Sequence, residues 1–491
     1  MYYRSTRGVK PDFFESAFVI KQGLATDGGL FVPTEIPKLD EVILTALSKM
    51  SYQECAAYIL GLFLTDFSKS ELRDAAKKAY STTKFGTPPV KLTRLDNDYV
   101  LELWHGPTAA FKDMALQIMP RLLSMSLEKT NEKRTALILV ATSGDTGKAA
   151  LEGYADVDNV KILVFYPALG VSDIQKRQMQ TQAGKNVRVV AINGNFDDAQ
   201  NGVKSIFGDS ELARVLNEKN VFLSSANSIN FGRLAPQIVY YVSAYCSLMK
   251  NKEISYGEKI NVTVPTGNFG NILAAYIAKK SGVPLGKLIC ASNKNNILTD
   301  FFNTGIYDKN RDFYTTVSPS MDILISSNLE RLLYIVAGPE KTIKYMNLLK
   351  QTGRFEVDDT VKNVLNQDFL AYYCDDDNTR ATIKNTFVQY NYLCDTHTAV
   401  GIYAAAEYKK QTSDNTKMLV ASTASPYKFA PAACDALDLH YDGDEFSAIE
   451  TLFTATGAAV PKNLAELKGK PIIFDKTIEI LKMSDEVKDF A

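Results

Sequence analysis

The chain has 491 residues, of which 46% are hydrophobic and 23% charged, and its 56 acidic and 55 basic residues leave a formal net charge of −1. These values are typical of a soluble globular protein and exclude a disordered, collagen-like or coiled-coil chain. The balance of charge also argues against a protein that binds nucleic acid along its surface, although it leaves room for a local anion site. At about 150 residues per domain, the length predicts roughly three domains.

Several other classes of protein are disfavoured by what the sequence lacks. No apolar run reaches the roughly 18 to 20 residues that a membrane span needs, and the N-terminus has no apolar signal core, so we expect no membrane association and a cytoplasmic location. The six cysteines are scattered without a CxxC pair, which predicts reduced thiols and no disulfide framework. The three histidines are scattered too, and no metal site is expected.

In chain order, residues 1 to about 95 carry mixed helical patterning broken by turns at 27–29 and 86–89. Strands and helices then alternate, and this spacing predicts parallel sheets covered by helices on both faces. In such sheets ligands bind at the carboxyl ends of the strands. The expected strands are 137–142, 160–166, 187–192, 221–223, 260–264, 288–291 and 418–421, and the expected helices are 197–217, 231–248, one from Lys148 and one ending near Lys280.

Two glycine-rich turns fall at such strand ends, at 142–147 and 266–271. Glycines let the backbone curve and expose its N–H groups, and the following helix adds the positive end of its dipole, so each turn suits a phosphate or a carboxylate. A tight turn without a ligand is the alternative. The first turn differs from a Walker A motif, because Thr142 stands where the first glycine belongs and Ala149 follows Lys148. Neither turn has the GxGxxG pattern of a dinucleotide site.

Lys112 lies among small and apolar neighbours, in the segment HGPTAAFKDMA that begins at His105. Burial there would lower the pKa of its amine, which a lysine that forms a Schiff base requires. Taken alone, a single lysine is far more often an ordinary one on an exposed helix face, and composition does not overturn that interpretation.

Seven segments together resemble, in order, the threonine synthases, which are pyridoxal-phosphate enzymes of the tryptophan-synthase-β fold family. The matching segments are YRSTRG at 3–8, DGGLFVP at 27–33, HGPT with FKD at 105–113, TSGDTG at 142–147, NSIN with Arg233 at 227–233, PTGNFGN at 265–271 and TASPYKF at 423–429. The resemblance spans nearly the whole chain. It implies an α/β fold of type II, with two parallel-sheet domains covered by helices and an N-terminal subdomain.

The resemblance also implies a role for each matching residue. Lys112 would hold the cofactor, pyridoxal 5'-phosphate, as a Schiff base and move protons, and Thr423 would bond the pyridine nitrogen. The cofactor phosphate would be held by Gly267, Asn268, Phe269, Gly270 and Asn271. The substrate carboxylate would be held by Ser143, Gly144, Asp145, Thr146 and Gly147, and its phosphate by Asn227, Ser228 and Arg233. The partner of the cofactor's 3-oxygen stays open, because many relatives have Asn where this chain has Asp145.

The implied reaction converts O-phospho-L-homoserine and water into L-threonine and phosphate. The resemblance further implies a monomer, and a division into residues 1–95, 135–225 for the small domain with the 142–147 turn, and 96–134 with 226–491 for the cofactor domain. Arg233 suits a phosphate because its planar fork binds two oxygens, whereas Asn227 and Ser228 are also suited to cap the next helix.

Two alternative functions remain open. One is a serine or threonine dehydratase, which needs no second phosphate site, and the other is a binding protein that has the fold but no catalytic activity. His105 is expected only to orient the loop before Lys112.

Overall fold

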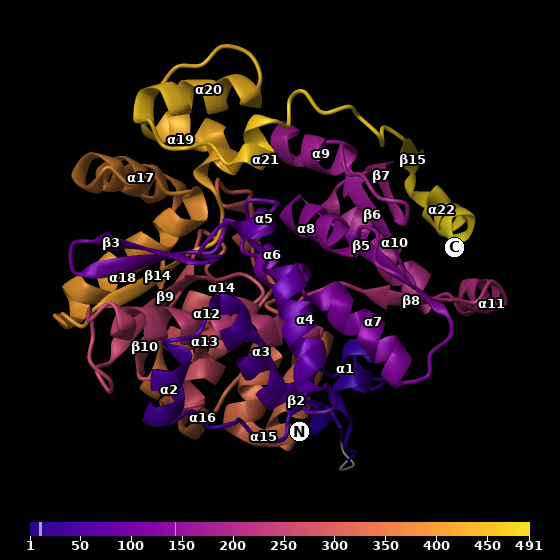
Figure 1. Ribbon diagram of the computed structural model, residues 1–491, viewed down its shortest axis with the longest axis horizontal. Coiled ribbons are helices and arrows are strands. Elements are labelled where there is room, and N and C mark those ends of the chain that lie inside the picture. Colours follow the sequence, from indigo (N-terminus) through magenta and orange to yellow (C-terminus); the bar gives the residue numbers. More distant parts are fainter. Residues whose placement is uncertain (9–11, 143) are drawn as a thin grey trace.

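The computed structural model describes residues 1–8, 12–142 and 144–491, and two sheets of parallel strands organise the fold (Figure 1). The smaller sheet is parallel throughout, and the larger sheet is parallel except for its edge strand β3. The larger sheet has the order β13 (Phe369–Tyr373), β10 (Leu285–Ser292), β9 (Ile260–Pro265), β14 (Met418–Ser422), β4 (Asp98–Glu102) and β3 (Lys91–Leu95). The smaller sheet has the order β15 (Thr477–Glu479), β7 (Val187–Asn193), β6 (Val160–Pro167), β5 (Thr135–Ala141) and β8 (Val221–Ser225). The predicted α/β architecture with two parallel sheets is confirmed.

The strands of the smaller sheet are apolar on both faces because each face is covered by helices. In β5, Leu137 and Leu139 point into the core under α10, α11 and α22, whereas Ile138 and Val140 point to the opposite core. Successive side chains of a strand alternate between faces, so a continuous apolar run is what a doubly covered strand requires. Around this sheet lie α8 (Asp145–Tyr154), α9 (Asp173–Gln180), α10 (Phe196–Gly208), α11 (Ser210–Glu218) and α22 (Met483–Phe490).

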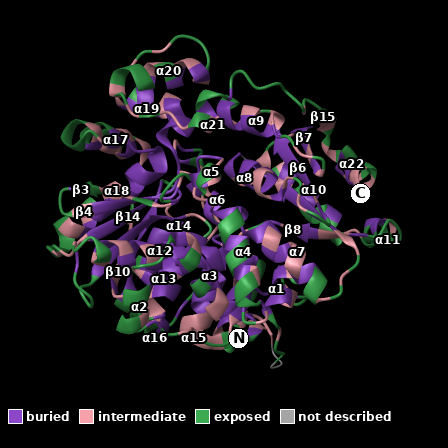
Figure 2. Ribbon diagram, viewed as in Figure 1, coloured by how far each residue is buried: buried purple, intermediate pink, exposed green. Residues whose placement is uncertain are grey.

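The larger sheet is covered in the same way. Val262 and Val264 of β9 face the core that contains α12 and α13, and Ile289 and Ala291 of β10 face α18. Figure 2 shows the strands as buried and the outer helices as partly exposed. The helices of this part are α12 (Phe231–Lys250), α13 (Gly270–Lys280), α14 (Ile297–Thr304), α15 (Leu329–Thr352), α16 (Asp359–Asp368), α17 (Asp376–Tyr390), α18 (Thr396–Thr412), α19 (Ala430–Ala436), α20 (Glu445–Thr456) and α21 (Lys462–Ala465), with the short 3-10 turns η1 (Pro319–Met321) and η2 (Pro426–Phe429).

The N-terminal region is largely helical, as expected from its patterning, and it shares a core with the larger sheet. Leu60 and Phe63 of α3 belong to the same buried cluster as Phe231 and Leu234 of α12. The elements before the larger sheet are β1 (Tyr3–Ser5), α1 (Ser16–Gln22), β2 (Phe31–Pro33), α2 (Glu41–Leu47), α3 (Tyr52–Phe63), α4 (Lys69–Ala79) and α5 (Thr82–Phe85), with α6 (Asp113–Leu116) and α7 (Met119–Lys129) following β4. Two short antiparallel pairs, β1 with β2 and β11 (Ile306–Asp308) with β12 (Arg354–Glu356), complete the strands.

The C-terminal segment lies with the smaller sheet. After α21 the chain crosses to that sheet, where β15 pairs in parallel with β7, and η3 (Ile480–Lys482) and α22 follow (Figure 1). Met483 and Val487 of α22 are buried against the smaller sheet. The division drawn from the sequence had assigned these residues to the larger domain, since a short strand this far along the chain carries no local sign of its partner.

One predicted helix is two. The segment 197–217 forms α10 and α11, which are separated at Asp209. Asp209 has an extended backbone and its carboxylate accepts the Leu212 N–H at 3.0 Å, so this residue begins the second helix. The prediction of one helix was therefore wrong, because apolar periodicity continues across a capping residue that restarts the helix.

The six cysteines are all buried and free. Among the described residues, no helix combines the length and the apolarity that a membrane crossing requires.

Candidate active site

Five of the segments singled out in the sequence follow the carboxyl ends of parallel strands. Loops at the same edge of a parallel sheet lie close together, which makes this edge the usual place of a ligand. The strands and the residues after them are β4 with Lys112, β5 with the 142–147 turn, β8 with Asn227, Ser228 and Arg233, β9 with the 266–271 turn, and β14 with Thr423. Asp145 and Arg233 both lie near enough to Lys112 to influence its charge, so three of these loops converge.

The loop that carries Lys112 is fastened to the end of β14. The Phe111 N–H donates to the Thr423 carbonyl oxygen at 2.8 Å, which brings Lys112 next to Thr423. Within the loop, the carboxylate of Asp113 accepts the N–H of Thr108 at 2.8 Å and its hydroxyl at 2.7 Å. The FKD and HGPT segments are thus two halves of one closed loop that holds Lys112 in place.

The amine of Lys112 is surrounded by more positive than negative charge. Burial lowers the pKa of Lys112 to about 8, the Asp145 carboxylate opposes this shift, and the charges of Lys428 and Arg233 add to it. An amine with such a pKa is partly unprotonated at neutral pH and can act as a nucleophile or a base. The lowered pKa that the sequence suggested for this lysine is therefore present.

The 266–271 turn connects β9 to α13 and has the geometry of an anion site. Phe269 has a positive φ of 65° directly before the helix, and a Cβ added to Gly267 would lie 2.9 Å from the Ser320 carbonyl oxygen. The carbonyl groups of the turn point to neighbouring donors: the Ser326 hydroxyl donates to the Gly267 oxygen at 2.7 Å. The turn therefore leaves its N–H side to a ligand.

Unpaired donors in this turn fit a phosphate group. Among the described residues, none of the backbone N–H groups of 267–271 donates to a protein acceptor. The side chain of Asn271 is buried, and its Oδ1 accepts the hydroxyls of Tyr240 at 2.7 Å and Tyr241 at 2.5 Å, while its Nδ2 has no partner. Buried donors are rarely left unpaired in proteins, and a helix N-terminus with free N–H groups is suited to bind an anion.

The 142–147 turn connects β5 to α8, with Ser143 outside the described residues. The Thr142 hydroxyl accepts the N–H of Gly144 at 3.0 Å and of Gly147 at 2.9 Å, which fixes the turn. A Cβ on Gly147 would lie 2.4 Å from the Thr142 side chain, so glycine is required there. Thr146, the remaining residue of the prediction, is partly exposed at the start of α8.

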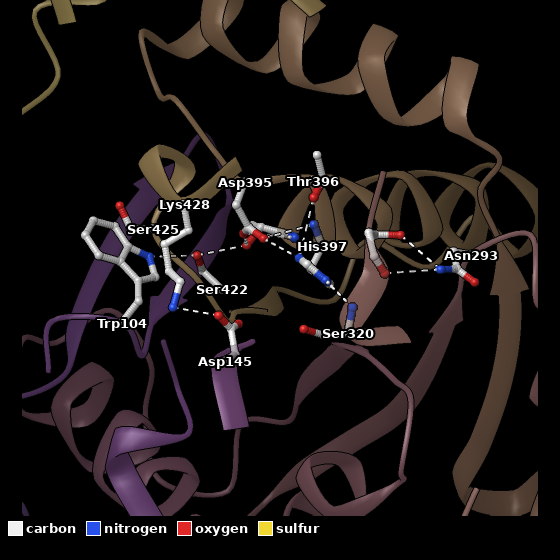
Figure 3. Close-up of polar contacts among 12 residues, drawn as sticks. Trp104, Asp145, Asn293, Ser320, Asp395, Thr396, His397, Ser422, Ser425 and Lys428 are labelled. Atoms are coloured by element: carbon white, nitrogen blue, oxygen red, sulfur yellow. Dashed lines mark hydrogen bonds and ion pairs between the residues drawn. The ribbon is translucent and has the colours of Figure 1, made fainter. Parts of the chain in front are cut away.

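Asp145, within this turn, is paired with a lysine that the sequence prediction of site residues omitted. The Lys428 Nζ lies 2.6 Å from the Asp145 Oδ1 (Figure 3), and the side chain of Gln175 donates to the same oxygen at 2.8 Å. Burial alone would raise the pKa of Asp145, but the charges of Lys428 and Lys112 outweigh it and hold that pKa well below its usual range. The signal was present in the sequence, since Lys428 belongs to the matching segment at 423–429.

Lys148, which made the first turn look like a phosphate-binding loop, is used elsewhere. Its Nζ contacts Glu152 at 3.0 Å and also bonds the Gln182 side-chain oxygen. These partners agree with the rejection of a Walker A motif, in which the lysine must be free to reach a phosphate.

Arg233, in the first turn of α12, is a buried cation without a carboxylate. It is 4% exposed, its Nη1 bonds the Ala226 carbonyl oxygen, and its Nε has no partner. No carboxylate lies within ion-pair distance of it among the described residues. Burial lowers the pKa of Arg233 to about 10, and the nearby Tyr154 opposes that shift. An arginine buried without an acid is suited to bind an anionic ligand.

Asn227 and Ser228 lie in the loop before α12, and neither caps that helix. The cap is Asn230, whose side-chain oxygen accepts the Gly232 N–H at 2.9 Å. Asn227 is exposed and Ser228 is partly exposed, so both side chains remain available near Arg233. The alternative that these two residues serve as helix caps is therefore wrong.

The start of α15 joins the two candidate anion sites and was not predicted. The Asn328 side chain donates to the Asn268 carbonyl oxygen at 3.0 Å and to that of Ser228 at 3.3 Å. Arg331, which is 1% exposed, bonds the Asn328 side chain and the Ile229 carbonyl oxygen. This bridge holds the 266–271 turn and the 227–230 loop in a fixed relation.

The N-terminal matching segments support the same bridge. Glu330 accepts the hydroxyl of Thr6 at 2.6 Å and the Nε and Nη2 of Arg7 at 2.8 and 2.7 Å. Arg331 donates from Nε to the Phe31 carbonyl oxygen at 2.9 Å. The YRSTRG and DGGLFVP segments thus support the site indirectly, because they hold the start of α15 in place.

A buried hydrogen-bond network supports the end of β14 and the loop beside the 266–271 turn (Figure 3). The Trp104 Nε1 donates to the Ser422 hydroxyl at 3.0 Å. His397 contacts Asp395 through Nδ1 at 2.8 Å and accepts the Ser320 N–H through Nε2 at 3.1 Å. With Nε2 as the acceptor, the ring proton lies on Nδ1. The network fixes Ser320, the residue that lies over Gly267.

His105 has a structural place in the loop before Lys112. Its Nε2 lies 2.7 Å from the Glu102 carboxylate, and its ring stacks on Trp104 with centroids 4.3 Å apart. No group of three or more potential metal ligands occurs in the described part of the chain.

Three family models together match almost the entire chain. "Threonine synthase N terminus" matches residues 2–80, "Pyridoxal-phosphate dependent enzyme" matches 80–423, and "Threonine synthase, C-terminal" matches 398–490.

Related sequences agree with these models. The threonine synthase of Saccharomyces cerevisiae is 38% identical over 464 residues, which are 89% of each chain, and that of Schizosaccharomyces pombe is 37% identical over 99% of this chain and 98% of its own. The human threonine synthase-like 1 is 38% identical over 94% of this chain, but the chain spans only 64% of that protein's length.

Solved structures give the same result. The threonine synthase of Brucella melitensis, described with bound pyridoxal phosphate, superimposes with a TM-score of 0.89 at 36% identity and covers 100% of this chain and 99% of its own. The yeast threonine synthase also has a TM-score of 0.89, at 35% identity, with coverage of 100% and 98%. The fold, the convergent loops and these relatives together lead to one conclusion: the chain belongs to the threonine synthase family of pyridoxal-phosphate-dependent enzymes.

Proposed function

We propose that the protein converts O-phospho-L-homoserine and water into L-threonine and phosphate with the help of pyridoxal 5'-phosphate. The observation that carries this proposal is the presence of two separate anion sites near Lys112. One is the 266–271 turn at the start of α13, and the other surrounds the buried Arg233. A cofactor phosphate and a substrate phosphate together require two such sites, whereas a serine or threonine dehydratase needs only one.

The described residues fit the cofactor. Its phosphate would be held by the free N–H groups of 267–271 and the unpaired Nδ2 of Asn271, and the partly unprotonated Lys112 amine would bind its aldehyde carbon. Thr423, 6% exposed directly after β14, would offer a hydroxyl to the pyridine nitrogen and so leave that nitrogen largely unprotonated. When bound, pyridoxal phosphate withdraws electrons from an attached amino acid and thereby acidifies its Cα proton.

Lys112 moves the protons of the reaction. It removes the proton from Cα of the substrate, and after loss of a Cβ proton the phosphate leaves from Cγ. A proton then adds at Cγ, which becomes the methyl group, the hydroxyl of water adds at Cβ, and a proton returns to Cα. The two protons taken from Cα and Cβ are thus balanced by those returned at Cγ and Cα, and the remaining proton of water leaves with the phosphate. These atoms are neighbours, so one mobile amine with a pKa near neutrality is suited to serve them in turn.

The remaining residues orient the substrate. Arg233 holds the phosphate that leaves, with Asn227 and Ser228 beside it, and the 142–147 turn, including Ser143, holds the carboxylate. Binding the substrate at both ends keeps Cα, Cβ and Cγ fixed while protons move among them. The ligand is accordingly a small molecule, and we propose a monomer that acts in the cytoplasm.

The test of this function has two parts. The purified protein, with pyridoxal phosphate added, is expected to show the visible absorption of the bound cofactor and to release phosphate and L-threonine in equal amounts from O-phospho-L-homoserine. A protein that gains no colour would contradict the role of the cofactor. Colour without release of phosphate would instead favour the dehydratase.

Lys112→Ala is expected to abolish release of L-threonine, because it removes the amine that we propose moves the protons. The affinity for pyridoxal phosphate should fall but remain measurable in equilibrium dialysis, since the 266–271 turn survives. Lys409→Ala, which removes a lysine paired with Asp98 at the opposite end of β14, is the control and should retain activity. Turnover by Lys112→Ala would contradict the role given to this residue.

A further inference from the structure

Lys428 is a buried lysine that joins the two halves of the site. Its side chain is fully buried, and its Nζ lies 2.6 Å from the Asp145 Oδ1 and donates to the Thr108 carbonyl oxygen at 3.0 Å. Lys428 belongs to η2, which follows β14 of the larger sheet, whereas Asp145 begins α8 after β5 of the smaller sheet. Lys428 therefore connects the 142–147 turn, through the ion pair shown in Figure 3, with the loop that carries Lys112, through its bond to Thr108.

The position of Asp145 creates an electrostatic conflict. The 142–147 turn is where we propose that a substrate carboxylate binds, yet the turn carries a carboxylate of its own that is 5% exposed. Two like charges repel strongly in a buried setting, because little water is present to screen them. The uncharged Gln175 bonds Asp145 but does not cancel its charge. Lys428 is the residue in direct contact with Asp145 that does.

We propose that Lys428 is a positioning residue that neutralises and orients Asp145, so that the turn at the start of α8 accepts the carboxylate of an amino-acid substrate. The inference rests on the proposed function and extends it to a residue for which that function names no role. It explains why a turn that binds a carboxylate contains an aspartate: the Asp145–Lys428 pair carries no net charge. It also explains why a lysine is buried at a place without access to solvent, since its two acceptors are both part of the site.

The test compares two ligands that differ only in the carboxylate. L-Threonine and L-threonine amide are titrated into the holoenzyme, and binding is followed by the change in absorbance of the bound cofactor. The variants are Lys428→Met, Lys428→Arg, Asp145→Asn and the double variant Asp145→Asn/Lys428→Met. Lys409→Met, in which a lysine paired with Asp98 at 2.6 Å is removed far from the site, is the matched control.

Lys428→Met is expected to weaken binding of L-threonine by about tenfold or more, because a buried acid loses its partner. Binding of L-threonine amide should change by no more than about threefold, since that ligand brings no negative charge to the turn. Lys428→Arg should restore binding of L-threonine, and Asp145→Asn should bind it at least as tightly as the wild type does. The double variant lacks both the Asp145 carboxylate and the Lys428 amine, so no buried negative charge remains to repel the ligand. Most of the affinity lost in Lys428→Met should therefore return.

Three results would overturn the inference. The first is an equal loss of affinity for L-threonine and for L-threonine amide in Lys428→Met. The second is a loss of affinity for L-threonine alone in Asp145→Asn. The third is a double variant as weak as Lys428→Met, which would mean that Lys428 contacts the carboxylate itself. If Lys428→Met does not fold or bind the cofactor, Asp145→Asn and Lys428→Arg decide alone. Failure of the wild-type holoenzyme to bind L-threonine would count against the proposed function and not against the role of Lys428.

Discussion

The chemistry of the site depends on three cations and one anion that lie close together. Asp145, Arg233 and Lys428 all lie near enough to Lys112 to influence its charge, and the four side chains come from different parts of the chain. Lys428 is paired with Asp145, and Arg233 has no acid. Arg233 would therefore be available to a phosphate, and the surplus of positive charge around Lys112 favours the unprotonated amine that would attack a carbonyl group. At this scale the function is a matter of which cation is left without a partner.

The first prediction concerns the pH dependence of Lys112. Only the unprotonated amine attacks an aldehyde, and a pKa of about 8 means that this form becomes abundant well below the range of an ordinary lysine. In the protein freed of cofactor, the rate of colour development with pyridoxal phosphate should rise with pH and level off above about pH 8. The rate for Nα-acetyl-lysine, which keeps a free side-chain amine, should continue to rise with pH toward the pKa of that amine, about 10.4. A protein profile that follows acetyl-lysine would contradict the lowered pKa.

The second prediction concerns Arg233. Arg233→Gln should lower kcat/KM for O-phospho-L-homoserine by about 100-fold or more, because a bidentate contact to a phosphate is lost in a buried place. The absorption of bound cofactor and the affinity for L-threonine should be nearly unchanged, since neither involves the second phosphate site. Arg214→Gln, which alters an exposed arginine on α11, is the control and should leave turnover intact. If Arg233→Gln also lost the cofactor, Arg233 would bind the phosphate of the cofactor and not that of the substrate.

At the scale of elements, the ends of helices do most of the positioning. Helices α8, α12 and α13 each begin directly at a candidate binding loop, and the start of α15 fastens two of these loops together. The start of α15 is held in turn by residues distant in sequence, since Glu330 and Arg331 bond Thr6, Arg7 and Phe31. The N-terminal segments thus stabilise the candidate site through α15, although they lie far from it in sequence.

The third prediction tests this bridge. Asn328→Ala removes the donor shared by Asn268 and Ser228 and deprives the buried Arg331 of a partner. The affinity for pyridoxal phosphate, measured by equilibrium dialysis, should fall by about tenfold, because a buried polar group left unpaired costs about 1–3 kcal/mol. Ser327→Ala is the matched control next to it in sequence, since that hydroxyl makes only a weak exposed contact at 3.4 Å, and it should have little effect. Equal affinities in the two variants would show that the bridge is dispensable.

On the scale of the whole molecule, the two sheets are tied by long-range connections at the site and at the C-terminus. The smaller sheet receives its edge strand β15 and its covering helix α22 from the far end of the chain. Its stability thus depends on residues that follow all of the larger sheet in sequence. A shortened C-terminus would expose apolar surface on β6 and β7.

The fourth prediction measures that dependence. Val487 in α22 is fully buried against the smaller sheet, and Val487→Ala should lower the free energy of unfolding by roughly 1–3 kcal/mol through loss of buried methyl groups. Unfolding in urea, followed by circular dichroism, is the measurement. Asp489→Ala, on the exposed face of the same helix, is the control and should be near neutral. An unchanged midpoint for Val487→Ala would mean that α22 adds nothing to the fold.

Much of the fold and part of the site could be predicted from the sequence because the signals are local. Apolar runs, capping residues and glycine-rich turns act over a few residues, so strands such as β6 and β9, and both turns, were found within one or two residues of their ends. The break at Asp209 was missed because periodicity passes over it. Lys112 and Arg233 could be identified from the segments that match the family. The charged groups around Lys112 could not be predicted, because they come from distant parts of the sequence.

The sequence by itself determined the alternation of strands and helices, the two glycine-rich turns at strand ends and the candidate lysine Lys112, since each depends on neighbouring residues. Only the tertiary structure decided that Lys428 is the partner of Asp145, that Asn328 and Arg331 join the 266–271 turn to the 227–230 loop, and that the last strand completes the smaller sheet. The physical reason is that a contact between distant residues is set by the order of strands in a sheet. That order follows from how whole faces are buried against one another, which no single stretch of sequence records.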